Sequence, residues 1–205
     1  MRLSIFPVKT LVGNDLVDLE LPQAQAKFRD KRYVERVLTS SEIQTLAQAQ
    51  KPHQMLCTFW AAKESCFKVL QKLDPNTVFS PRLLEVQGSP ESSSSSVLHF
   101  QDRQLFVSWT WGEGWVHCLA TMSLSYSPLF RVETFDSHQF SESEAVRNLG
   151  KKLFQELGWT EVQFRRVIRQ DSRPLWPQAY LGSNLIPVDV SFSHDGRFVA
   201  SALAW

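Results

Sequence analysis

The chain has no long hydrophobic run, few cysteines and almost no net charge, and each shortage excludes a class of protein. No window holds the roughly 20 consecutive apolar residues of a transmembrane helix, so we expect no membrane contact. The first residues, MRLSIFP, lack the apolar core of a signal peptide, which predicts a cytoplasmic protein. The formal net charge is +1, so nucleic acid is not an expected partner and any charged partner must bind a local patch.

The three cysteines do not have the spacing of a metal site. Cys57 and Cys66 lie on one predicted helix with a separation that places their thiols on opposite sides of it. We therefore expect Cys57, Cys66 and Cys118 to be reduced, packed side chains. A hydrophobic content of 43% and a charged content of 21% over 205 residues are typical of a globular protein with one large domain or two small lobes.

Helical and strand patterns alternate twice along the chain. The first half predicts a strand near 11–19, helices at 24–38, 40–50 and 53–73, and strands at 83–86, 97–100, 105–109 and 115–120. Thr39 and Glu42 have the spacing of a capping box. The second half predicts a strand at 132–135, a helix at 142–157, a strand at 162–168, a proline-containing loop at 171–182, and strands at 188–193 and 198–205.

These patterns predict an α+β fold of two lobes, each with helices packed on a small antiparallel sheet. We place the boundary in the segment 123–128 and divide the chain into residues 1–126 and 127–205. The two halves show no clear sequence repeat.

The segment Phe59–Lys68 (FWAAKESCFK) is the most informative stretch of the chain. Glu64 and Lys68 lie four residues apart and therefore share one helical face, with Trp60 one turn earlier. An exposed pair of this kind is common and is worth only about 0.3–0.5 kcal/mol. A functional site needs a second carboxylate, and Asp15 at the end of the first predicted strand is the candidate. Mg²⁺ takes one or two protein carboxylates and leaves room for substrate phosphates, so Asp15 and Glu64 together could form a magnesium site.

Several residues of the second half have both an ordinary and a functional interpretation. His194 precedes a predicted turn and could be a hydrogen-bonded turn residue, or it could contact a phosphate together with the Ser193 hydroxyl. Arg173, beside a proline, is typical of an exposed loop, whereas at a cofactor site its guanidinium would bind a phosphate with two hydrogen bonds.

Basic residues cluster just after the first predicted strand. Arg29, Arg32 and Arg36 have the i, i+3, i+7 spacing of one stripe on a continuous helix. A charged stripe is usually a solvated face. The alternative is a docking surface for an acidic partner, while the surrounding excess of positive charge that nucleic acid requires is absent.

Together these motifs resemble the signature of the 4'-phosphopantetheinyl transferases. The sequence GND at 13–15 is similar to that family's Gly-x-Asp motif, and 60–68 to its Trp-x-x-Lys-Glu-(Ala/Ser) motif with a Lys four residues after the Glu. The segment 36–42, RVLTSSE, resembles the family's stretch before its next helix. SFSHDG at 191–196 is similar to the Ser-x-Ser-His strand, and SRP at 172–174 lies where members usually carry Gly-Lys-Pro.

The order of the motifs resembles two branches of the family at once. The two-lobe enzymes of the surfactin-synthetase type carry Gly-Lys-Pro and Ser-x-Ser-His first, whereas here they come last, as in the shorter holo-acyl-carrier-protein synthases. The resemblance therefore implies a two-lobe pseudodimer of permuted connectivity with pseudo-twofold symmetry, and we expect a monomer. Val17 stands where the larger enzymes carry an extra acidic residue, which implies two protein carboxylates on the metal.

The resemblance implies transfer of the phosphopantetheine arm of coenzyme A to a serine of an apo acyl or peptidyl carrier protein, with release of adenosine 3',5'-bisphosphate. Asp15 and Glu64 would hold Mg²⁺ against the pyrophosphate, which Lys68 and Lys63 would clamp. Glu64 or a metal-bound water would accept the serine proton. The second lobe would bind the 3'-phosphate and adenine end through Arg173, Ser193 and His194.

Carrier proteins are acidic around the modified serine, so the resemblance assigns carrier docking to Arg29, Arg32 and Arg36. It does not specify whether the carrier protein serves fatty acid, polyketide, peptide or polyunsaturated-lipid biosynthesis. Two alternatives from other classes stay open. One is a non-catalytic module that binds coenzyme A or a carrier protein without turnover, which magnesium-dependent release of adenosine bisphosphate would distinguish. The other is an interaction protein whose motifs are coincidental, and it would not bind coenzyme A.

Overall fold

The computed structural model describes residues 10–124, 127–168 and 174–205. The first lobe contains β1 (Val12–Asp18), α1 (Pro22–Arg29), α2 (Lys31–Val37), α3 (Ser40–Ala47), α4 (Pro52–Leu73), a 3-10 turn (Pro81–Leu83), β2 (Glu85–Val86), β3 (Ser95–Phe100), β4 (Arg103–Gly112) and β5 (Trp115–Thr121). The second contains β6 (Leu129–Thr134), α5 (Glu142–Glu156), β7 (Val162–Ile168), β8 (Pro174–Leu181), β9 (Asn184–Asp195) and β10 (Phe198–Ala204).

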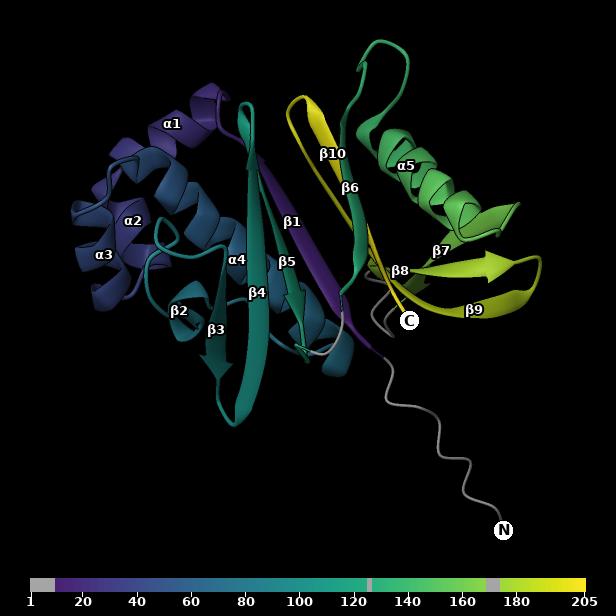
Figure 1. Cartoon of the computed structure of the whole chain (residues 1–205), viewed down its shortest axis with the longest axis horizontal. Helices are drawn as coiled ribbons and strands as arrows, with labels where there is room; N and C mark the ends of the chain where they lie inside the picture. Colours follow the sequence, from purple (N-terminus) through teal and green to yellow (C-terminus); the bar gives the residue numbers. More distant parts are fainter. Residues whose placement is uncertain (1–9, 125–126, 169–173) are drawn as a thin grey trace.

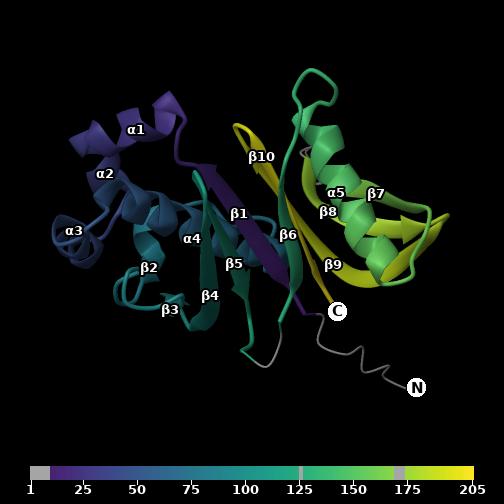
Figure 2. The same cartoon turned by 45° about the horizontal axis from the view of Figure 1, so that its top comes forward.

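The two lobes repeat one topology. Their five-stranded antiparallel sheets have the orders β1-β5-β4-β3-β2 and β6-β10-β9-β8-β7, so each strand of the second sheet takes the place of the strand five numbers earlier. Helix α4 covers the first sheet and α5 the second, and both views show the sheets facing each other between the two helical layers (Figures 1 and 2). The predicted α+β fold of two similar lobes is confirmed.

The prediction of one helix at 24–38 is wrong in one respect, because the chain forms two helices there, α1 and α2, with a break at Asp30. The Asp30 side chain accepts hydrogen bonds from the backbone N–H groups of Arg32 and Tyr33 and so caps a new helix. Arg29 therefore lies on α1, whereas Arg32 and Arg36 lie on α2. The single stripe inferred from a continuous helix does not exist in that form.

The capping box predicted at the start of α3 is confirmed. The Thr39 hydroxyl accepts from the Glu42 N–H at 3.2 Å, and the Glu42 carboxylate accepts from the Thr39 N–H at 2.8 Å. The two cap residues fix the start of α3 at Ser40.

The prediction of a loop at 171–182 is wrong from Pro174 onward, where the chain forms strand β8. Prolines suggested a loop because proline removes a ladder hydrogen bond. The sheet accommodates Pro177 through irregular register, with shifts in the β7 pairing between Arg166 and Ile168 and in the β9 pairing between Gln178 and Tyr180. The missed strand completes the second sheet.

Close packing of α4 on β1 explains the glycine of the GND motif. A Cβ atom placed on Gly13 would lie 1.9 Å from the backbone oxygen of Ser65. The helix can therefore approach the strand only where the strand has no side chain. This approach brings the residues of α4 that follow Ser65 next to Asp15.

The outer edge of β1 is hydrogen-bonded by side chains from the other lobe. Strand β1 pairs with β5 on one side only. Every second residue of β1 points its N–H group to the other side, where that group needs an acceptor. Alternate residues of β9 supply one each, and the bonds run from the N–H groups of Val12, Asn14, Leu16 and Asp18 to Asp189 Oδ2, Ser191 Oγ, Ser193 Oγ and Asp195 Oδ2 at 2.9, 2.9, 3.1 and 2.9 Å. We call these four contacts the side-chain ladder.

Charged groups reinforce both ends of the side-chain ladder. Lys72 of α4 donates to Asp189 Oδ2 at 2.7 Å, and both side chains are almost wholly buried. At the other end, Arg197 donates through Nε and Nη2 to the two carboxylate oxygens of Asp18, each at 2.9 Å. Burial alone would raise the pKa of Asp18, but the hydrogen bonds from Arg197 and from the Glu20 N–H, together with the Arg197 charge, hold that pKa below its usual value.

A buried polar contact within the first sheet lies against the second lobe. Asn14 Nδ2 is 3.2 Å from His117 Nε2, and the His117 ring stacks on Phe130 of the second lobe with ring centroids 5.0 Å apart. Burial lowers the pKa of His117 to about 3, so the ring is neutral and its Nε2 can accept from the amide. The second residue of the GND motif therefore contributes to the contact between lobes.

Cys57, Cys66 and Cys118 are all buried and unpaired, as the sequence predicts. None of the helices in the described part of the chain combines the length and the apolar character of a membrane span.

Removing one rung of the side-chain ladder should destabilise the protein. In Ser191→Ala the buried Asn14 N–H would lose its acceptor, and we expect the free energy of unfolding to fall by about 1–3 kcal/mol. Urea denaturation measures the change. Ser92→Ala, on the exposed loop before β3, is the control and should stay within about 0.5 kcal/mol of the parent. Equal stabilities of Ser191→Ala and the parent would contradict the importance of the ladder.

Candidate active site at the lobe interface

Both lobes line a cavity of about 230 Å³ beside the side-chain ladder. Its walls come from β1, the α1–α2 segment and α4 of the first lobe, and from the end of β9 in the second. The polar and aromatic lining residues are Asp15, Gln23, Lys27, Tyr33, Cys57, Trp60, Glu64, His194 and Asp195. The arrangement matches a ligand site in being concave, partly apolar and equipped with a few convergent charged groups.

Asp15 is held in place by a residue from each lobe. Its Oδ1 accepts from Lys68 Nζ at 2.9 Å and from Ser193 Oγ at 2.9 Å, while Lys68 also donates to the Asn14 carbonyl at 2.7 Å. Within the described part of the chain no hydrogen bond uses Asp15 Oδ2. One carboxylate oxygen is thus fixed by the protein and the other is left for a ligand.

Glu64 lines the same cavity from α4, one turn before Lys68. No hydrogen bond or ion pair of its carboxylate is formed within residues 10–124, 127–168 and 174–205. Burial, followed by the charge of Asp15, raises the pKa of Glu64 to about 7. Two carboxylates from different elements therefore share one cavity at an electrostatic cost, which a bound cation would offset.

His194 and Asp195 bring the second lobe to the cavity. His194 Nδ1 lies 3.0 Å from Glu142 Oε2 at the start of α5. Asp195 accepts from the Asp18 N–H in the ladder, and burial, more than the neighbouring charges of Asp15 and Asp18, raises its pKa. The sequence interpretation treated Asp195 only as a turn residue. Its two-residue spacing from Ser193 on a strand was the signal that both face the first lobe.

Lys27, which precedes Arg29 in the basic cluster of the sequence, is a second cavity residue for which the sequence predicted no role there. Its Nζ lies 5.6 Å from the ring centroids of both Tyr33 and Trp60, and it belongs to the cavity lining. The break at Asp30 turns α1 relative to α2, so a member of the basic cluster reaches the cavity.

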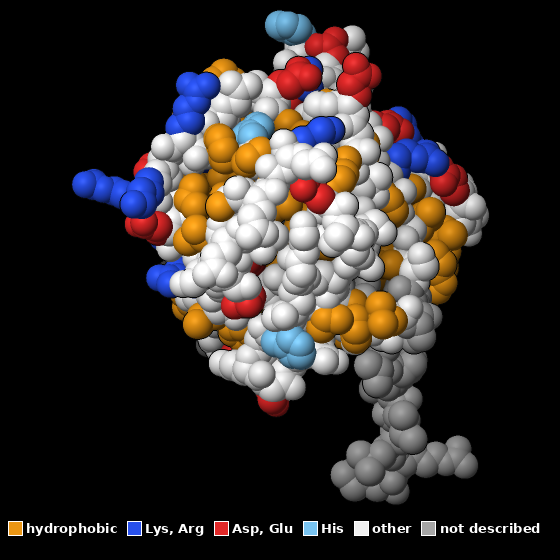
Figure 3. Space-filling model, turned by 60° about the vertical axis from the view of Figure 1, so that its left-hand side comes forward, with side chains coloured by type: hydrophobic (Ala, Val, Ile, Leu, Met, Phe, Trp, Pro, Cys, Tyr) orange, Lys and Arg blue, Asp and Glu red, His pale blue; other side chains and the backbone are white. Residues whose placement is uncertain are grey.

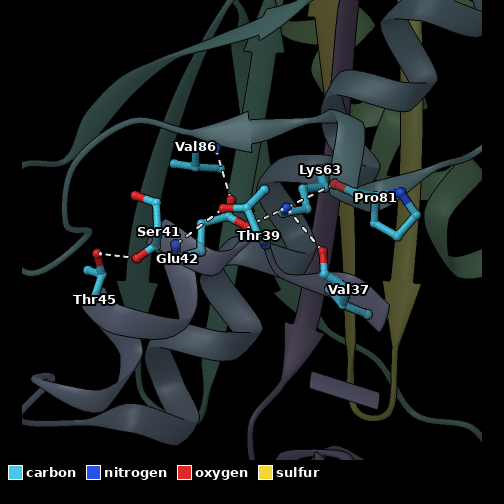
Figure 4. Close-up of polar contacts among 8 residues, drawn as sticks. All are labelled: Val37, Thr39, Ser41, Glu42, Thr45, Lys63, Pro81 and Val86. Carbon is cyan, nitrogen blue, oxygen red and sulfur yellow. Dashed lines mark hydrogen bonds and ion pairs between the residues drawn. The ribbon is translucent and has the colours of Figure 1, made fainter. Parts of the chain in front are cut away.

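Lys63 does not reach the cavity, and its burial is at odds with its predicted role on a pyrophosphate. Lys63 Nζ lies 2.6 Å from Glu42 Oε2 and donates to the carbonyls of Val37 at 3.1 Å and Pro81 at 2.9 Å (Figure 4). The side chains of Lys63 and Glu42 are 0% and 1% exposed, and Glu42 also caps α3 and accepts from the Val86 N–H. Lys63 therefore joins α2, α3, α4 and the 3-10 turn.

The predicted docking arginines, Arg29, Arg32 and Arg36, are exposed on α1 and α2. Figure 3 shows the face of the molecule that includes these helices, with Lys and Arg side chains gathered most densely along its left edge beside apolar side chains. On this face of the molecule, positive charge is therefore unevenly distributed. Arg173 lies outside the described residues.

The residues present fit a magnesium ion that also binds substrate phosphates. No three His, Cys, Asp or Glu side chains of the described chain converge as a complete metal cage. Mg²⁺ does not need one, since it commonly takes one or two carboxylates and fills its other positions with water and phosphate oxygens. Asp15 and Glu64 supply that number.

Breaking the Lys63–Glu42 pair should cost stability, and neutralising both partners should recover part of it. Lys63→Met leaves a buried carboxylate without its cation, for which we expect a loss of about 3–5 kcal/mol in the free energy of unfolding. Adding Glu42→Gln removes that charge, so the double variant should be more stable than Lys63→Met alone. Lys152→Met, from an exposed ion pair with Glu133, is the control and should cost less than about 1 kcal/mol. Additive losses in denaturant titrations would contradict the pairing.

Comparisons with known proteins identify the family of the chain. A family model described as the 4'-phosphopantetheinyl transferase superfamily matches residues 11–120, which run from the start of β1 into β5. A holo-[acyl-carrier-protein] synthase of Leptospira biflexa serovar Patoc, in each of two strains, is 28% identical over 95 residues, which cover 46% of this chain and 74% of that enzyme. The family match takes in more than half of the chain and includes Asp15, Glu64 and Lys68. The protein therefore belongs to the 4'-phosphopantetheinyl transferase superfamily.

Proposed function

We propose that the protein transfers the 4'-phosphopantetheine group of coenzyme A to a serine of an apo acyl or peptidyl carrier protein and releases adenosine 3',5'-bisphosphate. The observation that carries this proposal is the cavity between the lobes, where Asp15 and Glu64 face a common space and Lys68 is fixed on Asp15. Membership of the superfamily supports the transfer chemistry.

The charges of the cavity suggest how coenzyme A lies in it. The pyrophosphate would occupy the space next to Asp15 and Glu64, with Lys68 and Lys27 as the neighbouring cations. Mg²⁺ held by the two carboxylates would supply the positive charge that neutralises the pyrophosphate as the leaving group departs.

The adenosine end would point toward the second lobe. His194 lines both the main cavity and a smaller hollow of about 70 Å³. Ser143 and Arg147 of α5 and Arg166 of β7 also line this hollow, so it is basic and suits the 3'-phosphate. In this proposal His194 and Arg173 also bind the adenosine end of coenzyme A. Ser193 acts instead through its hydrogen bond to Asp15.

The transfer forms one P–O bond and breaks another. The carrier serine oxygen attacks the phosphorus on the pantetheine side, the bridging P–O bond breaks, and adenosine 3',5'-bisphosphate leaves. Glu64 faces the cavity without a hydrogen bond in the described chain and is the candidate to accept the serine proton. Since one chain supplies residues from both lobes, the site needs no second subunit, and we expect a monomer in gel filtration.

Incubation with coenzyme A, Mg²⁺ and an apo carrier protein tests the proposal. We expect the carrier to gain one phosphopantetheine group, about 340 Da from its composition, by intact mass. Asp15→Asn and Glu64→Gln should each slow the transfer by about a hundredfold or more, because each removes a carboxylate that would hold the cation. Glu156→Gln, from the exposed pair with Arg131, is the control and should transfer at the parent rate.

Omission of Mg²⁺, or its removal with a chelator, should also abolish the transfer. Binding of coenzyme A without transfer to several carrier types would favour a non-catalytic binding module. If the protein neither binds coenzyme A nor transfers the group, the assignment of the cavity is overturned.

The exposed arginines of α1 and α2 should act on the carrier protein rather than on coenzyme A. We expect Arg32→Glu and Arg36→Glu each to raise the KM for an acidic carrier about tenfold at low salt, with a smaller effect at high salt, because screening weakens exposed charge pairs. Neither should change the Kd of coenzyme A. Arg103→Glu, on β4 of the first sheet, serves as a charge-matched control. An unchanged KM for the carrier in both variants would contradict docking at this surface.

A further inference from the structure

Asp195 is a carboxylate of the cavity that the proposed reaction leaves without a role. Asp15 and Glu64 are assigned to the cation, whereas Asp195 lines the same cavity from the end of β9 and is half-buried there. Within the described part of the chain Asp195 forms no ion pair, although Lys27 also belongs to the lining. An unpaired carboxylate is unfavourable beside a ligand that carries several phosphates. A hydrogen-bond donor on the ligand would make its position favourable.

The Asp195 carboxylate is held in one orientation with one oxygen left over. Its Oδ2 accepts from the Asp18 N–H at 2.9 Å as the last rung of the side-chain ladder. Among the described residues no hydrogen bond uses Asp195 Oδ1. A ligand group that binds a fixed acceptor does not have to immobilise a free side chain, so Oδ1 is well suited to accept from a ligand.

The cavity can hold only part of coenzyme A. Its volume is about 230 Å³, whereas pockets for drug-sized molecules alone span roughly 300–1,000 Å³. The donor must therefore continue into an adjoining hollow. The hollow that Arg147 and Arg166 make basic shares His194 with the cavity, and we call it the basic hollow.

Asp195 lies between the two parts of the site that suit phosphates. Two residues before it on the same side of β9, Ser193 binds Asp15 at the position proposed for the pyrophosphate. Its chain neighbour His194 lines both the cavity and the basic hollow. Consecutive residues of a strand point to opposite sides, so Asp195 faces the first lobe while His194 turns toward the hollow. A donor that spans the pyrophosphate position and the basic hollow therefore passes Asp195.

The part of coenzyme A between these two phosphate groups is the ribose. Its 5'-oxygen carries the pyrophosphate and its 3'-oxygen carries the remaining phosphate, so the 2'-hydroxyl is the one hydrogen-bond donor of this sugar. An ionised carboxylate only accepts hydrogen bonds, and it forms short, strong ones with hydroxyl groups. Acidic side chains bind ribose hydroxyls in this way in dinucleotide-binding folds.

We propose that Asp195 accepts a hydrogen bond from the ribose 2'-hydroxyl of coenzyme A through Oδ1, and that it thereby selects coenzyme A over its 2'-deoxy analogue. This inference rests on the proposed transfer function and adds a specificity-determining residue from the second lobe. The bonds formed and broken in the transfer stay the same. A site built to accept from a hydroxyl group discriminates against the analogue that lacks it, because the fixed acceptor then loses its donor.

Titration calorimetry with coenzyme A and 2'-deoxycoenzyme A, each with Mg²⁺, tests the inference. The two ligands carry the same charge and differ in one hydroxyl group, so the ratio of their Kd values isolates that group. We expect the parent protein to bind coenzyme A about tenfold or more tightly than the analogue, as is typical of a hydrogen bond to a charged acceptor.

Asp195→Ser should bring the two Kd values within about twofold of each other. Serine can keep the ladder rung, since Ser191 and Ser193 accept N–H groups of β1 through Oγ in the same ladder, but it has no second oxygen for the ligand. Asp195→Asn keeps the rung through its amide oxygen and places an uncharged amide at the position of Oδ1. Its ratio should lie between those of the parent and Asp195→Ser.

Two control variants should keep the parent ratio. Ser191→Ala removes a neighbouring rung of the ladder but no residue of the cavity lining, so it measures the effect of a weakened ladder alone. Asp102→Ser removes an exposed carboxylate at the turn between β3 and β4, so it measures the effect of net charge alone. A ratio changed as much in either control as in Asp195→Ser would contradict a direct contact.

Equal Kd values of the two ligands in the parent would overturn the inference and leave the proposed function intact. A parent ratio that persists in Asp195→Ser would also overturn it, because the hydroxyl would then be bound by another group. If Asp195→Ser weakens both ligands equally, the partner of Oδ1 is a donor that both ligands share, such as the adenine amino group, and the inference is wrong. Failure of the parent to bind either ligand would count against the proposed function, and the inference would fall with it.

Discussion

The unpaired edge of β1 is the constraint on which the rest of the structure depends. A strand that pairs on one side only presents a row of N–H groups, and burying them without acceptors would cost about 1–3 kcal/mol each. Strand β9 meets this need with side-chain oxygens from every second residue, not with its backbone. The lobes are thereby fixed in register, because a one-residue slip would turn these four side chains away from β1.

The same register places the candidate active site. Asp15 lies on the face of β1 that meets α4, next to the ladder rung at Leu16, and Ser193 serves both by accepting from the Leu16 N–H and donating to Asp15 Oδ1. A serine that would otherwise suggest a ligand contact thus orients a carboxylate. Because each lobe contributes its half through its own strand, the order in which the halves occur along the chain does not affect the geometry. Permuted motif order and an intact site are therefore compatible.

Three lysines on α4 show how little a motif says about the role of a side chain. Lys63 binds Glu42 in the core of the first lobe, Lys68 binds Asp15 at the cavity, and Lys72 binds Asp189 across the lobe interface. All three are basic residues of one helix, within or just beyond one family motif. Their spacing of four to five residues turns them toward different neighbours, and only the neighbours decide whether a lysine is structural or faces a substrate.

The sequence by itself determined the α+β class, the two lobes, the capping box at Thr39 and the carboxylates Asp15 and Glu64, because local periodicity, cap spacing and a specific motif combination carry that information. Only the tertiary structure decided the break at Asp30, the strand β8, the burial of Lys63 and the presence of Lys27 and Asp195 at the cavity. Each of these depends on partners distant in the chain or on competition between a side-chain cap and a continuing helix. No local pattern encodes which acceptor a buried N–H or ammonium group will find. That choice is made when the two sheets pack and every buried polar group must be paired.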